Sequence, residues 1–130
     1  IPILGICLGM QLLCRCSEEG ELPGLGFVPA RVLSLDCEAR ENLKIPHMGW
    51  NTLDVVRKNS LIAANSGTQR FYFVHSYYVE LENNDLCLAQ ADYGVGFCAA
   101  FQSNKIFGVQ FHPEKSHRFG MSLMRNFVDL

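Results

Sequence analysis

The pentapeptide Gly5-Ile6-Cys7-Leu8-Gly9 constrains the fold more than any other part of this sequence. It joins the apolar run Ile3–Cys7, which is typical of a buried strand, to Leu8–Arg15, which we expect to be a helix that follows with almost no loop. A nucleophilic residue between glycines at a strand–helix junction is the pattern of a nucleophile elbow, a turn so sharp that larger flanking side chains would collide. The pattern predicts an α/β protein.

An elbow would expose the Cys7 side chain at the N-terminus of the helix. Unpaired amides and the helix dipole favour the thiolate there, and the amide of Leu8 would point to where an oxyanion forms. The same pentapeptide also fits a buried cysteine in a glycine-containing turn, so these five residues leave both interpretations open.

Length and composition indicate one globular domain. The chain has 130 residues, of which 48% are hydrophobic and 18% charged, and 11 basic against 13 acidic residues give a net charge of −2. This charge excludes the strongly basic footprint of a nucleic-acid or anionic-membrane binder. No apolar run approaches the ~20 residues of a membrane span, and no basic leader is seen, so we expect a cytoplasmic protein. Because the chain opens on the apolar run Ile1–Ile6, we expect it to be truncated at its N-terminus.

The six cysteines are expected to be reduced, and most of them to be small buried hydrophobic residues. They stand at positions 7, 14, 16, 37, 87 and 98. The only close pair, Cys14 and Cys16, has a spacing that does not suit zinc. We expect no metal and no cofactor.

The remaining pattern is strand-rich and ends in a helix. A polar connection is expected over Asp36–Leu43. Apolar periodicity predicts a C-terminal amphipathic helix from Phe119 onward. Alternation and turn residues predict strands over Phe27–Leu35, Phe71–Leu81, Leu86–Tyr93, Gly96–Gln102 and Ile106–Phe111, with an ordered loop over Ile45–Asn51.

The tripeptide His112-Pro113-Glu114 follows the last predicted strand. A cysteine nucleophile needs a base to take and return its proton, and the imidazole needs an acceptor that fixes its tautomer. His112 and Glu114 lie on the same side of an extended segment that Pro113 stiffens, so the carboxylate can reach the ring. With Cys7, these residues form a candidate Cys-His-Glu triad, although the tripeptide alone also fits a solvated surface turn.

A second candidate base lies in the aromatic segment Phe71–Tyr78. Phe71, Phe73 and Val74 fit a core strand, whereas Tyr72, His75, Ser76 and Tyr77 are more polar than a core requires. No carboxylate follows His75 by two residues, so we rank it below His112.

These motifs together resemble the class I (triad) glutamine amidotransferases. GICLGMQLL around Cys7 and GVQFHPEKS around His112 carry the family resemblance, and KIPHMGWN and FYFVHSYY narrow it to the glutaminase subunit of imidazole glycerol phosphate synthase and its close paralogues. The resemblance runs from Ile3 to about Phe127. It implies a flavodoxin-like doubly wound sheet whose first strand–helix units, with the glycine-containing turn that supplies a second oxyanion amide, are missing from this chain.

The resemblance also assigns roles. Cys7 would attack the glutamine carboxamide to form a γ-glutamyl thioester, His112 would be the general acid and base, Glu114 would orient His112, and the Leu8 amide would bind the oxyanion. Four residues would hold the amino-acid end of glutamine: Gln11, Glu19, Ser76 and Tyr77. Four would face the partner, a (β/α)8-barrel synthase subunit that receives the ammonia in a heterodimer: His47, Met48, Trp50 and Lys115.

Two alternatives remain at this point. The segment KSHRFGM after Glu114 is closer to paralogues that supply ammonia for amidation of a nucleotide-linked sugar in surface-polysaccharide biosynthesis. A non-catalytic interaction module is the other alternative, and the intact triad argues against it. We expect these 130 residues alone to be weakly folded and nearly inactive, because removal of one oxyanion donor typically costs ~10²–10³ in rate.

Overall fold

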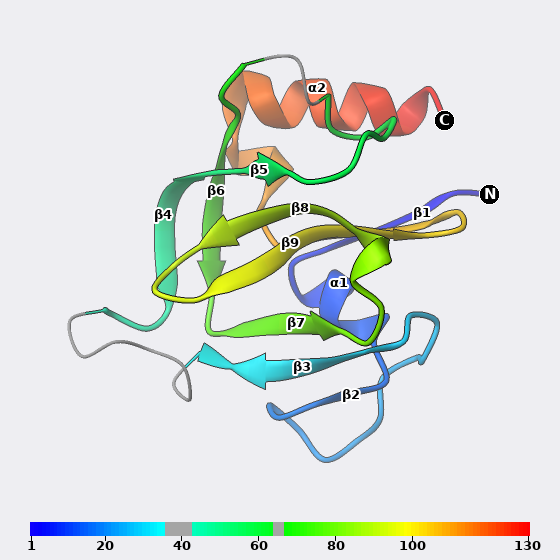
Figure 1. Cartoon of the computed structure of the whole chain (residues 1–130), viewed down its shortest axis with the longest axis vertical. Helices are drawn as coiled ribbons and strands as arrows, with labels where there is room; N and C mark the ends of the chain where they lie inside the picture. The colour runs from blue at the N-terminus through cyan, green and yellow to red at the C-terminus, as the bar shows by residue number, and fades with distance from the viewer. Residues whose placement is uncertain (36–42, 64–66) are drawn as a thin grey trace.

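The computed structural model of the chain describes residues 1–35, 43–63 and 67–130 (Figure 1). Most of the expected polar connection over 36–43 therefore lies outside the described residues. The elements follow the order β1 (Ile3–Ile6), α1 (Leu8–Leu12), β2 (Cys16–Ser17), β3 (Ala30–Ser34), β4 (His47–Thr52), β5 (Asp54–Val55), β6 (Arg70–His75), β7 (Tyr77–Leu81), η2 (Asn84–Leu86), β8 (Cys87–Asp92), β9 (Gly96–Ser103), β10 (Ile106–Val109), η3 (Pro113–Lys115) and α2 (His117–Val128).

The main sheet is mixed. Six of its strands follow the order β1-β10-β9-β7-β3-β2, and β8 joins β9 to β5. Strand β1 runs parallel to β10, and β2 runs parallel to β3, whereas the remaining pairs are antiparallel. The predicted α/β class with an antiparallel portion is confirmed.

A second, two-stranded sheet consists of β4 and β6, which pair antiparallel from His47↔His75 to Thr52↔Arg70. The loop predicted over Ile45–Asn51 is therefore wrong. Pro46 lies before the strand, where its missing N–H costs no ladder bond, and Gly49 is tolerated because β6 supplies a partner along the whole of β4. Figure 1 shows β4 and β6 running across the direction of β3 and β7.

The single strand predicted over Phe71–Leu81 is two strands. The chain bends at Ser76, so that β6 pairs with β4 while β7 pairs with β3 and β9. Buried positions alternate along β6, but Tyr78 and Val79 are both buried after the bend. No glycine or proline marks the bend in the sequence, so only the different pairing partners separate the two strands.

The core has two parts. One is rich in phenylalanine and lies between the strands and α2, with Phe71, Phe73 and Phe111 fully buried. The other lies between α1 and the strands, around Met10, Val32 and Phe101. Phe71 and Phe73 are core residues as predicted, whereas Val74 is only half-buried. The C-terminal helix begins at His117, two residues before the predicted position.

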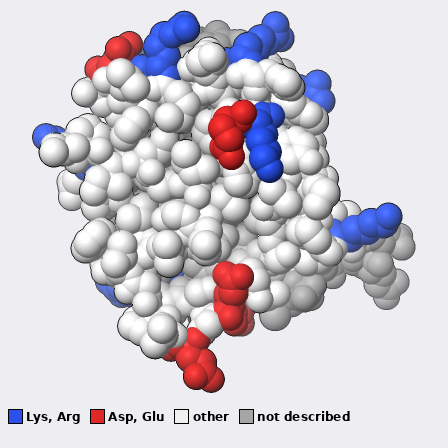
Figure 2. Space-filling model, turned by 180° about the vertical axis from the view of Figure 1, so that it is seen from behind, with Lys and Arg blue, Asp and Glu red and all other residues white. Residues whose placement is uncertain are grey.

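Charged residues are spread over the surface. Figure 2 shows one face on which basic and acidic side chains are scattered around a largely uncharged centre. This agrees with the net charge of −2. Within the described residues, no helix combines the length and the apolar character needed to cross a membrane.

The junction of β1 and α1 holds a single residue, Cys7, at φ 53° and ψ −107°. Its amide donates to the Val109 carbonyl at 2.8 Å, and its carbonyl accepts from the Gln11 amide at 3.2 Å. The expected collision of side chains is real at Gly5, where a Cβ would lie 2.7 Å from the Gly9 backbone. At Gly9 a Cβ would meet nothing within 4 Å, so for that glycine the steric prediction is wrong.

Alanine at these two glycines should therefore have opposite effects on stability. In the protein expressed from its complete gene, Gly5→Ala should lower the free energy of unfolding by roughly 1–3 kcal/mol or more, because two backbone segments must move apart. Gly9→Ala should raise it by about 0.5–1 kcal/mol through helix propensity. Urea unfolding midpoints measure both changes, and equal losses at the two positions would contradict the steric assignment.

Candidate active site

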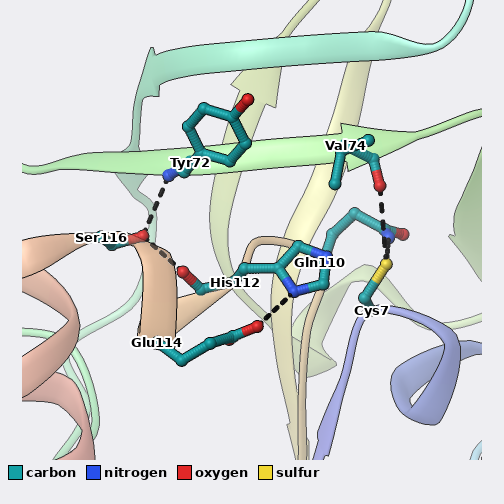
Figure 3. Close-up of polar contacts among 7 residues, drawn as sticks. All are labelled: Cys7, Tyr72, Val74, Gln110, His112, Glu114 and Ser116. Carbon is teal, nitrogen blue, oxygen red and sulfur yellow. Dashed lines mark hydrogen bonds and ion pairs between the residues drawn. The ribbon is translucent and has the colours of Figure 1, made fainter.

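Cys7 lies against the edge of β6. Its thiol donates to the Val74 carbonyl at 3.7 Å, and the side-chain amide of Gln110 donates to its sulfur at 3.6 Å (Figure 3). Strand β4 occupies the opposite edge of β6. The nucleophile candidate therefore covers backbone that would otherwise be an open sheet edge.

Burial raises the pKa of the Cys7 thiol above its ordinary value. The Leu8 amide and the Gln110 side chain lower it, and the carboxylates of Glu114 and Glu19 raise it further. The Leu8 amide at the helix N-terminus lowers the pKa as predicted, but burial raises it by more. The helix contributes little because α1 has only five residues, and the sulfur is partly withdrawn from water. Cys7 therefore rests as a thiol and needs a base.

His112 and Glu114 form the contact that their spacing predicts. His112 Nδ1 lies 2.8 Å from Glu114 Oε2 across the turn η3. Burial raises the pKa of Glu114, but its own backbone amide and His112 outweigh this effect and leave the pKa below its usual value. With Nδ1 held by the carboxylate, Nε2 is the nitrogen left for a proton transfer, and in Figure 3 it lies on the side of the ring that faces Cys7.

His112 is fixed on the same edge of β6 as Cys7. Its amide donates to the Tyr72 carbonyl at 2.9 Å, and its carbonyl accepts from the Ser116 hydroxyl at 2.6 Å. The Tyr72 amide donates to that same hydroxyl at 3.0 Å. Carbonyls two residues apart on a strand point the same way and are about 7 Å apart, so Tyr72 and Val74 hold His112 and Cys7 side by side.

The expected glutamine-binding residues divide into two groups. Gln11 is buried, and its side-chain amide donates to the Tyr77 carbonyl at 3.1 Å and to Gln110 Oε1 at 3.0 Å. Ser76 and Tyr77 are half-buried at the bend between β6 and β7, beside Gln11. Glu19 is exposed, and its charge acts on the Cys7 thiol.

The expected partner-facing residues are exposed with one exception. Met48 is 61% and Trp50 39% exposed on β4, and Lys115 is exposed in η3. The Trp50 ring stacks on His117 at 5.5 Å between centroids. His47 needs correction, because it points inward from β4, is 3% exposed and hydrogen bonds within the chain. Alternation along the strand puts it on the face opposite to Met48 and Trp50.

His47 belongs instead to a buried histidine pair. His47 Nδ1 lies 3.0 Å from His75 Nε2, and His75 Nδ1 lies 2.8 Å from the Tyr77 carbonyl. Asn51 Nδ2 extends this series of hydrogen bonds and lies 3.3 Å from His47 Nε2. Burial lowers the pKa of each histidine to about 4. His75, the second candidate base, thus has both ring nitrogens engaged away from Cys7.

Two residues of the site were missed by sequence reasoning. Gln110 and Ser116 are both fully buried and polar, and each touches a member of the candidate triad. Their position beside His112 in the motif GVQFHPEKS was the available signal. Within residues 1–35, 43–63 and 67–130, no three side chains of His, Cys, Asp or Glu are grouped to hold a metal ion. The five described cysteines are free, and Cys37 lies outside the described residues.

The histidine pair makes stability depend on pH. Both rings are neutral when folded down to about pH 4 but titrate near 6.5 when unfolded. The unfolded state therefore binds more protons between these values, and stability is fully present above pH 6.5 and is lost as pH falls toward 4. From pH 7 to 5 we expect a loss of roughly 2–4 kcal/mol in urea unfolding, about 2 kcal/mol for each histidine.

The matched variants are His47→Gln, which cannot titrate and should reduce this loss, and the exposed His117→Gln, which should retain it. Equal stability of the parent protein at pH 7 and pH 5 would contradict the assignment.

Comparison with known proteins identifies the family of this chain. The family model for class-I glutamine amidotransferases matches residues 1–130. The imidazole glycerol phosphate synthase subunit HisH of Bdellovibrio bacteriovorus is 47% identical over all of this chain and 64% of its own length. HisH 2 of Methanococcus maripaludis is 50% identical over 98% of this chain and 62% of its own length. The chain thus spans just under two thirds of the curated relatives that it matches.

Among solved structures, a Thermoplasma acidophilum protein described as part of a GMP synthase superposes with a TM-score of 0.71 at 23% identity. The match covers 98% of this chain and 56% of the other. The likeness shows that the two share a fold. With the family model matching from end to end and the expected fold present, this chain belongs to the class-I glutamine amidotransferases.

Proposed function

We propose that the chain carries the glutaminase site of an imidazole glycerol phosphate synthase. One observation supports this above all: Cys7 and the His112–Glu114 pair are held on one edge of β6 by neighbouring carbonyls. A thiol, an imidazole with one free nitrogen and a carboxylate in this arrangement suit acyl transfer through a covalent intermediate.

In the proposed reaction the Cys7 sulfur attacks the carboxamide carbon of glutamine while His112 Nε2 takes the thiol proton. The C–O π electrons move to the oxygen, which the Leu8 amide stabilises. As the intermediate collapses, His112 returns the proton to the departing nitrogen, the C–N bond breaks and ammonia leaves. A water molecule, deprotonated by His112, then cleaves the γ-glutamyl thioester and gives glutamate and the free thiol.

Each residue's environment fits its part. The raised pKa of Cys7 makes proton removal by His112 necessary, and the lowered pKa of Glu114 keeps a carboxylate beside the imidazolium that forms. Glutamine would bind at the bend between β6 and β7, with Ser76 and Tyr77, and near Glu19, whose charge suits an α-amino group. Gln11 would support this bend, because its amide is committed to the Tyr77 carbonyl and to Gln110.

The partner would be a (β/α)8-barrel synthase that uses the ammonia to make imidazole glycerol phosphate and AICAR. The subunit names of the relatives support this partner. Met48, Trp50 and Lys115 offer an exposed, partly aromatic surface, and Arg70 lies over the Trp50 ring at 5.8 Å. An exposed tryptophan held by stacking is a suitable interface anchor. We place the protein in the cytoplasm, in histidine biosynthesis.

An electrophilic glutamine analogue should label Cys7 alone. Intact mass and peptide mapping of the protein expressed from its complete gene should show one adduct that excess glutamine prevents. His112→Ala should slow labelling by about 10²–10⁴, the usual contribution of a general base. His117→Ala, which removes an exposed histidine nearby, should label at the parental rate. Adducts scattered over several cysteines would contradict the proposed site.

The pathway is tested separately in a histidine auxotroph that lacks this subunit. The complete gene should restore growth without histidine, and Cys7→Ser should fail at equal expression, because the serine hydroxyl is a far poorer nucleophile beside this base. Glutaminase activity without rescue would favour the alternative partner, which amidates a nucleotide-linked sugar.

A further inference from the structure

Gln110 is a polar residue where the fold calls for an apolar one. It lies in the run Phe107-Gly108-Val109-Gln110-Phe111, whose other members are apolar and buried, and its own side chain is fully buried. Burying an amide is costly unless its donors and acceptor are satisfied. The side-chain amide of Gln110 hydrogen bonds to Cys7 and Gln11, which points to a role at the site rather than in packing.

The orientation of the Gln110 amide follows from a backbone group. The Tyr77 carbonyl is an acceptor only, so Gln11 must turn its NH₂ group toward it. That same NH₂ group faces Gln110 at 3.0 Å, so Gln110 must present its oxygen there. The NH₂ group of Gln110 is then left to face the Cys7 sulfur at 3.6 Å. A reversed Gln110 would set two donors against each other.

We infer that Gln110 is a further catalytic residue, a fixed hydrogen-bond donor that stabilises the Cys7 sulfur as it becomes a thiolate, and that Gln11 is the positioning residue that aims it. The catalytic part of this inference rests on the proposed function, whereas the effect of Gln110 on the Cys7 thiol does not. The neutral thiol donates to Val74, and that bond ends when the proton leaves, whereas the bond from Gln110 strengthens because hydrogen bonds to charged acceptors are the stronger ones.

Other groups also act on the sulfur, and they remain in every variant below. The Leu8 amide favours the thiolate, whereas the carboxylates of Glu19 and Glu114 oppose it. His112 faces it from the end of β10 (Figure 3). The difference between the parent protein and the uncharged variant Gln110→Met therefore reports the Gln110 donor and not a change in these charges.

The test is the pH dependence of Cys7 alkylation by iodoacetamide, which needs no glutamine and no turnover. It uses the protein expressed from its complete gene, with the modified peptide quantified by mass spectrometry. Gln110→Met should move the midpoint of the profile upward by about one pH unit, a tenfold change in thiolate fraction. Gln110→Glu keeps the shape and the acceptor for Gln11 but replaces the donor with a negative charge, so both changes should move its midpoint further upward than that of Gln110→Met.

Gln11→Met should produce a smaller upward shift, because Gln110 keeps its NH₂ group but loses its anchor. Gln90→Met, the same change at an exposed glutamine on β8, should leave the midpoint unchanged. An unchanged midpoint in either folded Gln110 variant, or a larger shift in Gln11→Met than in both, would overturn the inference. If glutaminase assays fail while the alkylation midpoints shift as expected, the proposed function is wrong and the donor role stands.

Discussion

The parallel pairing of β1 with β10 is the contact on which the site depends. It matches Ile6 with Val109 and extends one residue further through the bond from the Cys7 amide to the Val109 carbonyl. The candidate site begins with the residues that follow these strands: Cys7 after β1, and Gln110 and His112 after β10. Residues more than one hundred positions apart meet because two short strands end together.

Strand β6 completes this arrangement from the other side. One edge pairs with β4, and the other is covered by the Val74–Cys7, Tyr72–His112 and Tyr72–Ser116 bonds. An open edge in the middle of a domain would leave backbone groups unsatisfied. Here the candidate catalytic residues satisfy them, so one set of hydrogen bonds both closes the sheet and sets the distance between nucleophile and base.

The parts of the site that were predictable from the sequence are local. Cys7 lies between glycines, and His112 and Glu114 are two residues apart, so spacing alone predicts an elbow and a paired imidazole. The inward position of His47 and the strand around it depend on β6, more than twenty residues away, and no local pattern encodes that partner. The role of Gln110 also depends on distant residues. Its amide hydrogen bonds to Cys7 and Gln11, which lie about one hundred positions earlier in the sequence, so no local pattern predicts it.

Hydrogen bonds connect most of the buried polar side chains to one another. The buried polar residues of the described chain are Gln11, His47, His75, Gln110 and Ser116, and all of them contact the site or one another. The Tyr77 carbonyl accepts from His75 on one side and from Gln11 on the other. Because His75 Nδ1 donates to the Tyr77 carbonyl, His75 Nε2 must accept from His47 Nδ1. His75 can accept at Nε2 only while its ring is neutral. Protonation of His75 would set N–H against N–H across the 3.0 Å contact with His47, which opposes charging of the ring in addition to the burial that lowers the pKa of both histidines. The Tyr77 carbonyl thus anchors the neutral histidine pair on one side and, through Gln11, the amide of Gln110 that faces Cys7 on the other.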